Sequence, residues 1–403
     1  MAIQFSSVGR GSISAPWRRA EWWGASIALY LQSGATGNLG LKVLLPPAYL
    51  ITVALVANNA GQLLLALRRC PLITFLLVLP FLSVAWSTSG SISLRRAIAL
   101  TFSMALAYVL AIRFTPRQLL LIVASVLLPA LAGSLAMLVI TPSLARMPDG
   151  TISGLFSHKN LLGWNAAAGL FVGAVLTADA VVSRVIGVTI VAIGLVCLVA
   201  SGSTTALLSV LVAIVLTLFY WALRRMRGLG RILLFLLVMQ GMAVSYVVGS
   251  EFVAPALAAL GKDTTLTGRV PMWHFEDEAI QQKPLLGYGY QAFWSDGSGA
   301  GWKIKSEIDW DSPNAHNGYR EILLAFGVLG FIPFMILIVR TLVKGAKFHI
   351  RAPDDSWLGL NVLIGMLLVT NITESIFYMP YNFLFIIFMA SVVMISIRKP
   401  GFY

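Results

Sequence analysis

The feature that most constrains this chain is a succession of apolar stretches, each long enough to cross a lipid bilayer as a helix. A helix needs about 20 apolar residues to span the hydrocarbon region, and such stretches recur from residue 21 to residue 397. They lack the strand-length alternation of apolar and polar residues that a membrane β-barrel requires. Only 11% of the residues are charged, against about 25% in an ordinary soluble domain. The sequence therefore predicts an all-α polytopic membrane protein.

We predict about twelve transmembrane helices in a single integral membrane domain that covers residues 1–403. The helices are expected at residues 21–35, 41–66, 71–86, 91–112, 118–140, 160–178, 184–201, 203–223, 231–249, 315–340, 356–373 and 381–397. No small-residue cleavage site follows the basic N-terminal stretch, so we expect the first helix to be retained.

The distribution of charge explains the formal net charge of +13. With the N-terminus inside, every connection that this topology places inside carries arginine or lysine, as the positive-inside rule requires. Both termini are therefore expected in the cytoplasm. The basic balance follows from topology, and no nucleic-acid partner is needed to explain it.

Two connections on the opposite side stand out. One is residues 141–160, and the other is the large loop 250–314 between the ninth and tenth helices, which we expect to be periplasmic. Long loops in compact proteins usually have a function. Within the large loop, the pattern predicts a helix that Thr267 caps and that ends before Pro284.

Polar residues near membrane depth are costly, so they are candidates for function. Those that collect on the outer side are Arg95, Arg96, Arg146, His158, Lys159, Arg269, His316, Arg320 and Glu374. Guanidinium groups bind phosphate bidentately, and an imidazole can accept a proton at neutral pH. The set therefore suits an anionic substrate whose reaction moves a proton. Each residue also has a plainer interpretation as an interfacial anchor, a helix cap or a salt-bridge partner.

The sequence predicts no metal site and no cofactor. Cys70 and Cys197 fall far apart, in or beside apolar segments, and we interpret them as buried or lipid-facing thiols rather than as a disulfide. No Cys-x-x-Cys or His-Glu-x-x-His spacing is present, so a structural zinc site is not expected.

Five motifs resemble, in order and spacing, the bacterial O-antigen ligase and polymerase superfamily. In the most telling one, His316 and Asn317 are followed after nine residues by GVLG at 327–330. The others are GLFSHKN at 154–160, SGSTTALL at 201–208, TGRVPMW at 267–273 with PLLGYGYQAF at 284–293, and NITESIF at 371–377. The resemblance covers about residues 70–398, and within the superfamily the chain looks most like polymerases of exopolysaccharides such as succinoglycan. The small residues of GVLG are expected to let a neighbouring helix approach closely.

The resemblance implies a GT-C-like fold and a metal-independent, inverting glycosyl transfer. The donor would be a glycan on undecaprenyl pyrophosphate, and the acceptor hydroxyl would lose its proton to His316. Arg269 would bind the pyrophosphate. Independently of the resemblance, Arg320 comes one helical turn after His316, so we expect it to orient His316 or to touch the second phosphate. Ligases of the superfamily carry an arginine where this chain has Thr204. The residues that are expected to supply a second pyrophosphate contact or to support the site are Arg146, His158, Lys159, Arg95, Arg96, Asn160, Asn317 and Glu374.

Three functions remain open from the sequence. The favoured one is a polymerase that joins lipid-linked repeat units at the periplasmic face of the bacterial inner membrane. The alternative is a ligase that moves finished glycan to lipid A core or to protein. A transporter or flippase for lipid-linked sugars should show charges at mid-membrane on several helices, whereas this chain concentrates its charges at one face. Besides the lipid-linked substrate and membrane lipid, a membrane partner that regulates chain length is left open.

Overall fold

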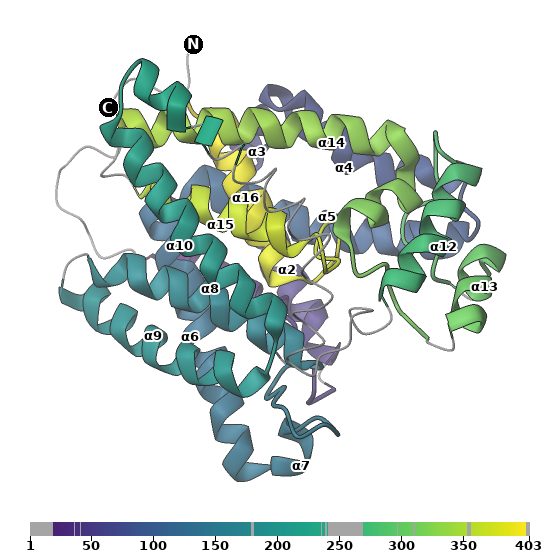
Figure 1. The fold of residues 1–403 in the computed structure, drawn as a ribbon, viewed down its shortest axis with the longest axis horizontal. Coiled ribbons are helices and arrows are strands. Elements are labelled where there is room, and N and C mark those ends of the chain that lie inside the picture. Colours follow the sequence, from purple (N-terminus) through teal and green to yellow (C-terminus); the bar gives the residue numbers. More distant parts are fainter. Residues whose placement is uncertain are drawn as a thin grey trace.

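The chain folds into packed helices in a computed structural model (Figure 1). The structure describes residues 19–35, 37–40, 42–178, 181–234, 236, 237, 240, 269–295, 297–308, 311–352 and 356–399. Within these ranges, the extended elements are limited to an isolated bridge between Arg146 and Ile152. Most of the predicted helix 231–249, the cap Thr267 and the first part of the loop 250–314 lie outside the described residues.

Most of the described helices overlap the ranges that hydropathy predicts, and the exception at 41–66 is given below. They are α1 (Ala20–Leu31), α2 (Leu45–Ala57), α3 (Ala60–Arg69), α4 (Pro71–Leu82), α5 (Gly90–Arg113), α6 (Pro116–Ile140), α7 (Pro142–Ala145), α8 (Lys159–Thr177), α9 (Val181–Ser201), α10 (Thr204–Arg225), α12 (Arg269–Gln282), α13 (Gly299–Ile308), α14 (Gly318–Arg351), α15 (Trp357–Thr370) and α16 (Phe383–Ile397). Short 3₁₀ turns precede α2 (η2, Lys42–Leu44) and follow α4 (η3, Ser83–Ala85). The all-helical class is confirmed for this part of the chain.

Local signals set the ends of the long helices. Thr115 and Gln118 form a capping box at the start of α6, with Pro116 at its first position, where the missing N–H costs no hydrogen bond. The side chains of Ser203, Asn317 and Asn382 cap α10, α14 and α16. Such caps satisfy backbone N–H groups that begin a helix without partners.

Within the described residues, six helices are long and apolar enough to cross a membrane: α5, α6, α8, α9, α10 and α14. A bent pair, α2 and α3, makes a seventh if it is one span. The helices α4, α15 and α16 are apolar but shorter. The molecule is therefore a multi-pass membrane protein.

The prediction of one continuous helix over 41–66 is wrong. The chain bends by 84° between α2 and α3. At the bend, the Asn59 amide donates to the carbonyl of Leu55 at 2.8 Å and competes with the regular backbone pattern, as asparagine often does. The second piece, α3, is amphipathic and ends in Arg68 and Arg69, which suits a helix that lies along a membrane surface.

Helix ends meet at one face through basic side chains, and we call it the basic face. The Arg113 guanidinium, at the end of α5, donates two hydrogen bonds to Glu21 at the start of α1 (3.0 and 2.7 Å). Arg398, after α16, donates to the carbonyl of Phe114 at 2.6 Å. The same ends were predicted to lie together from their basic residues.

The other helix ends meet through their connecting loops, and we call this end the loop face. Asn38 donates to the carbonyl of Gly154 at 2.7 Å, and Ile152 donates to the carbonyl of Ala200 at 3.1 Å. The elements α12 and α13 lie at one side of the molecule, beside the first turns of α14 (Figure 1). The long helices α5 and α14 begin at the loop face and end toward the basic face, as in a bundle that crosses a membrane repeatedly.

A break in α14 is filled by a loop. Gly327 has φ 58° and ψ −155° and interrupts the helix. The loop 284–289 inserts there: Val328 donates to Pro284 at 2.8 Å, while Tyr288 donates to Leu324 at 2.7 Å. The backbone groups that the break leaves without helical partners are thus satisfied. The neighbour of Gly327 is therefore a loop, whereas Gly330 lies against Leu79 of α4, so only the second of these glycines meets a helix as predicted.

The same loop is tied to the junction of α4 and α5. The Trp86 indole donates to the carbonyl of Leu286 at 2.7 Å, and the Ser93 hydroxyl donates to that of Tyr290 at 2.7 Å. Segment 284–290 therefore joins the end of α12 to α5 and α14. These contacts fix the position of α12 relative to α5 and α14.

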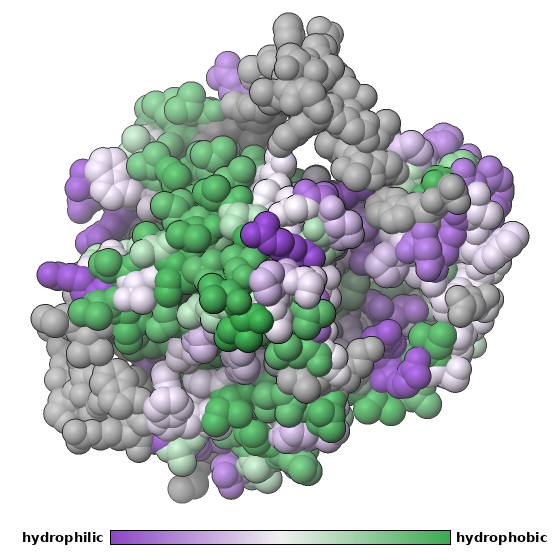
Figure 2. Space-filling view, turned by 90° about the horizontal axis from the view of Figure 1, so that it is seen from below, coloured by the Kyte–Doolittle hydropathy of each residue, from purple (hydrophilic) through white to green (hydrophobic). Residues whose placement is uncertain are grey.

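The distribution of polar and apolar residues on the surface agrees with a bundle whose basic face and loop face lie at opposite ends. Hydrophobic residues cover much of the face seen in Figure 2, and hydrophilic ones gather toward the side of α12 and α13. Along α9 and α10 many large apolar side chains are exposed, among them Val199, Leu211 and Leu218, which suits contact with lipid. The most buried helix is α16, whose side chains are almost all enclosed.

Candidate functional site

A buried carboxylate, Glu374, brings three other predicted site residues together at the loop face. Its Oε1 accepts hydrogen bonds from Arg269 Nη2 and Asn160 Nδ2, both at 3.0 Å. Its Oε2 lies 3.4 Å from His316 Nδ1. The Glu374 side chain is only 2% exposed, and burial of a carboxylate requires such partners. Residues far apart in sequence thus share one polar cluster, which we call the Glu374 cluster.

Arg269 is anchored as well as paired. It is the first residue of α12, and its Nη1 donates to the carbonyl of Thr373 at 2.7 Å. Its side chain is 13% exposed, so the guanidinium is nearly enclosed. The arginine therefore binds the turn between α15 and α16 with two of its nitrogens.

The turn that carries His316 is held by hydrogen bonds at successive amides. Ala315 N donates to Glu321 Oε1 at 2.8 Å, and His316 N donates to Asn314 Oδ1 at 2.9 Å. Asn317 N donates to Ser375 Oγ at 3.1 Å, and its side chain caps α14. The predicted supporting role of Asn317 thus takes the form of a helix cap.

The backbone at His316 is strained. Its φ of +45° lies in the left-handed region, which non-glycine residues occupy at a cost of about 1–3 kcal/mol. Two residues further on, Gly318 N donates to the carbonyls of both Asn371 and Glu374 (2.8 and 2.9 Å). A Cβ at position 318 would lie 2.1 Å from Asn371 Oδ1, so only glycine fits. The imidazole is therefore held against the 371–375 turn by its backbone.

The predicted residues of the loop 141–160 divide into two groups. Asn160 joins the Glu374 cluster, and His158 caps α8 by accepting from Asn160 N at 3.2 Å. Burial, followed by the nearby positive charge of Lys159, outweighs the attraction of Glu374 and lowers the pKa of His158. This favours the neutral imidazole that the cap needs.

Lys159 and Arg146 are not part of the cluster's hydrogen-bond network in the described residues. The Lys159 ammonium pairs with Asp149, and this contact holds the pKa of Asp149 below its ordinary value. Arg146 is exposed and bridges to Ile152 through its backbone.

Arg320 is engaged elsewhere than predicted. Its Nε and Nη2 donate to the two carboxylate oxygens of Asp277 at 2.9 and 2.8 Å, and its guanidinium carbon lies 5.0 Å from the centre of the Trp273 ring. The His316 ring instead faces Glu374, whose Oε2 lies 3.4 Å from Nδ1. The expectation that Arg320 orients His316 is therefore corrected: Glu374 takes that place.

Arg95 and Arg96 lie in the second turn of α5 and are exposed. They flank the part of α5 that holds Tyr290 through Ser93, so they belong to the loop face. Among the described residues, the hydrogen bonds of the Glu374 cluster do not include them.

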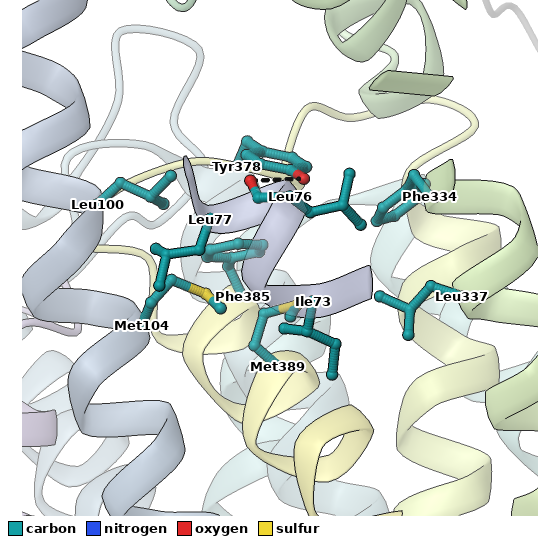
Figure 3. Close-up of a pocket in the computed structure, with 10 residues that line it drawn as sticks. All are labelled: Ile73, Leu76, Leu77, Leu100, Met104, Phe334, Leu337, Tyr378, Phe385 and Met389. Carbon is teal, nitrogen blue, oxygen red and sulfur yellow. Dashed lines mark hydrogen bonds between the residues drawn. The ribbon is translucent and has the colours of Figure 1, made fainter. Parts of the chain in front are cut away.

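An apolar pocket lies among the membrane helices α4, α5, α14 and α16 (Figure 3). It is lined by Ile73, Leu76, Leu77, Leu100, Met104, Phe334, Leu337, Tyr378, Phe385 and Met389. The Tyr378 hydroxyl donates to the Leu76 carbonyl at 3.3 Å. This lining offers no acid, base or cation, so we place the chemistry at the Glu374 cluster instead.

Sequence reasoning missed the contribution of α12 beyond Arg269. Trp273, Glu276 and Asp277 all face the first turns of α14. The helical spacing of 269, 273 and 276/277 could have placed them on one face of α12. In the described residues, no group of three His, Cys, Asp or Glu side chains could hold a metal ion.

Two comparisons place the chain among known proteins. Residues 189–335, which include Arg269, His316 and Arg320, match the sequence model of the O-antigen ligase family. A curated relative is the "Exopolysaccharide production protein ExoQ" of Rhizobium meliloti (strain 1021), which is 33% identical over 204 residues. That alignment spans 47% of this chain and 46% of the relative, or about half of its length. The matches support an O-antigen ligase/polymerase-type protein, and the resemblance inferred from the motifs is confirmed.

Proposed function

We propose that this protein is a polysaccharide polymerase that joins oligosaccharide repeat units carried on undecaprenyl pyrophosphate. The observation that carries the proposal is the Glu374 cluster, in which a histidine, an arginine and an amide meet at the loop face. These groups suit proton removal from a hydroxyl and stabilisation of an anionic leaving group. The similarity to a protein named for exopolysaccharide production favours a polymerase.

In the proposed reaction, an acceptor hydroxyl attacks the anomeric carbon of the donor sugar from the side opposite its pyrophosphate. The new C–O bond forms as the bond to the pyrophosphate oxygen breaks, and the lipid pyrophosphate leaves with the electron pair. The configuration at the anomeric carbon is inverted. His316 Nε2 takes the hydroxyl proton, because Nδ1 faces the carboxylate of Glu374 and an ionised carboxylate can only accept a hydrogen bond. Glu374 then stabilises the imidazolium that forms.

Arg269 is the proposed pyrophosphate contact nearest to His316. Two of its nitrogens hold Thr373 and Glu374, and the rest of the guanidinium can meet the leaving group. Because Glu374 offsets its charge, a pyrophosphate needs further cations. Arg95, Arg96 and Arg146 are the exposed candidates on the same face, whereas Lys159 already pairs with Asp149.

We also propose that the chain crosses the membrane about twelve times, with both termini in the cytoplasm and the loop face in the periplasm. A GT-C-like arrangement is part of this proposal. The alternation of helix ends between the basic face and the loop face supports it, together with the positive-inside rule. An alkaline phosphatase fusion at residue 300 is expected to be active and a fusion after residue 399 inactive. The opposite pattern would reverse the orientation and remove the periplasmic site.

A second candidate is a ligase that transfers lipid-linked glycan to lipid A core or protein, because the matched family model is that of O-antigen ligase. The two functions differ in what a deletion strain accumulates. Loss of a polymerase leaves single repeat units on the surface polysaccharide, and loss of a ligase leaves uncapped acceptor. A membrane partner that regulates chain length stays part of the polymerase proposal.

Complementation of that deletion strain tests the polymerase function and the role of His316 as the base together. Wild-type protein is expected to restore high-molecular-weight polysaccharide, and His316→Ala is expected to lower its rate of formation by about 10²- to 10⁴-fold, the usual contribution of a general base. Polymer is measured by gel electrophoresis at matched protein levels in the membrane. His274→Ala is the control, because His274 is an exposed histidine that pairs with Glu278 on α12. Normal polymer from the His316 variant would refute this base.

A further inference from the structure

A second polar array lies next to the Glu374 cluster, between α12 and the first turns of α14. It consists of Trp273, Asp277 and Arg320. Arg320 donates two hydrogen bonds to Asp277 (2.9 and 2.8 Å), and the Trp273 ring lies under its guanidinium, 5.0 Å away. The Trp273 indole donates to the carbonyl of Ala315 at 2.9 Å. The array is therefore fixed to the residue that precedes His316.

On α12 the array follows Arg269 by one helical turn, and Arg320 lies in the first turn of α14, just after the turn that carries His316. Trp273 comes four residues after Arg269 on α12, and Arg320 is the third residue of α14, which Asn317 caps. Residues four apart share a helix face. A ligand that extends from the proposed base along these helices would next meet the indole and the ion pair.

The ion pair is accessible and has hydrogen-bonding capacity left. The Asp277 side chain is 49% exposed and that of Arg320 is 24% exposed. Arg320 uses two of its five N–H groups on Asp277, and each carboxylate oxygen can accept more than one hydrogen bond. An array of fixed donors and acceptors beside an aromatic face matches a sugar ring, which offers hydroxyl groups at its edge and C–H groups on its face.

The charge of the array argues against a phosphate group as its ligand. Arg320 and Asp277 cancel each other, and the adjacent Glu276 is fully buried, with Oε2 3.9 Å from Arg320 Nε. In the described part of the chain, neither Glu276 oxygen has a hydrogen-bond partner. Burial, with the nearby Glu321, raises the pKa of Glu276 well above its ordinary value, which disfavours its charged form. A neutral array suits a neutral polyhydroxyl ligand better than a pyrophosphate.

We propose that Trp273, Asp277 and Arg320 form the subsite for the terminal sugar of the acceptor chain. The inference rests on the proposed function, and it assigns the acceptor's side of the site, which the motifs do not reveal. The indole would cover one face of the acceptor ring, and the ion pair would bind two neighbouring hydroxyl groups. The hydroxyl that reacts would then lie toward His316.

Binding of a soluble acceptor tests the subsite. The probe is the repeat-unit oligosaccharide released from the host's own polysaccharide, free of lipid and phosphate, titrated into the full-length protein in lipid nanodiscs and followed by saturation-transfer NMR. Wild-type protein is expected to bind it saturably. Asp277→Asn is expected to weaken binding by about tenfold or more, the cost of a lost charge-assisted hydrogen bond. Trp273→Ala is expected to weaken it by a similar factor, because the sugar ring loses its aromatic contact. Trp273→Phe, which keeps an aromatic ring, is expected to retain most of the affinity.

Matched controls separate binding from folding. Glu278→Gln changes an exposed acid on the same helix that pairs with His274, and it should leave the affinity unchanged. Each variant must keep the wild-type unfolding temperature and a donor KM within about twofold in polymer formation. Absence of saturable binding, equal affinity in the Trp273→Ala variant, or Arg320-dependent binding of inorganic pyrophosphate in place of the oligosaccharide would overturn the subsite. If polymer formation still requires His316, the proposed function stands despite that failure.

Discussion

Glu374→Gln is expected to lower the turnover number of polymer formation by about 10³- to 10⁴-fold, the effect of reversing the histidine tautomer in a serine protease triad. Arg269 and Asn160 both donate to Oε1, so the amide oxygen of the glutamine must take that position. Its NH₂ group then faces His316 Nδ1, where Oε2 lies now. An NH₂ that donates to Nδ1 forces the ring proton onto Nε2, and Nε2 can no longer accept a proton from the acceptor.

The measurement is the initial rate of polymer formation by purified protein in liposomes at varied concentrations of lipid-linked repeat unit. Because the glutamine keeps the shape of the site, KM should change by less than about threefold while kcat falls. Glu374→Asp keeps the charge and should recover part of the rate. Asn160→Ala removes one donor to Oε1 and leaves His316 facing a carboxylate, so it should cost far less. A glutamine variant within about tenfold of wild type would show that Glu374 does not set the tautomer.

The sequence predicts the individual groups of this site better than their arrangement. His316 and Arg269 could be singled out because charged groups are rare in an apolar chain and each falls in a motif. Glu374 could be identified only as a supporting residue. Its central position depends on contacts to residues 160, 269 and 316, and no local pattern encodes distances between segments so far apart.

The prediction for Arg320 failed because its partner also comes from a segment that is distant in sequence. Arg320 is expected beside His316 because it comes four residues later, but His316 precedes α14 in a turn, and Asp277 reaches Arg320 from another helix. A cation beside a candidate base therefore seemed suited to phosphate. In the structure its charge is already balanced by a carboxylate, which changes the chemistry that it can perform.

Hydropathy predicts helices well and their interruptions poorly. The bend between α2 and α3 and the break in α14 both lie in apolar sequence, where a break leaves the mean hydropathy almost unchanged. The break at Gly327 depends on hydrogen bonds from segment 284–289, which is distant in sequence. Gly327 and Gly287 are each visible as glycines, but only the pairing of the two segments explains why glycine is needed at both.

Gly327→Ala is expected to destabilise the fold by about 3 kcal/mol or more, since a non-glycine residue in this backbone region costs about 1–3 kcal/mol and overpacking adds about as much again. Gly327 has φ 58° and ψ −155°, and a Cβ there would lie 2.4 Å from the carbonyl carbon of Leu285. This neighbour is backbone, held by hydrogen bonds between Leu285 and Leu329 and between Pro284 and Val328. It cannot turn away as a flexible side chain would.

The destabilisation should also reach the site, because segment 284–290 joins α12 to α14. Unfolding in mixed detergent micelles measures the stability, and the fraction of monodisperse protein gives an independent readout. The matched control is Gly61→Ala in α3, where a Cβ would meet open space and φ is ordinary for a helix. That change should be neutral or slightly stabilising, because alanine is the better helix former. If the two variants unfold alike, the inserted loop does not constrain α14, and His316 must be positioned by the 371–375 turn alone.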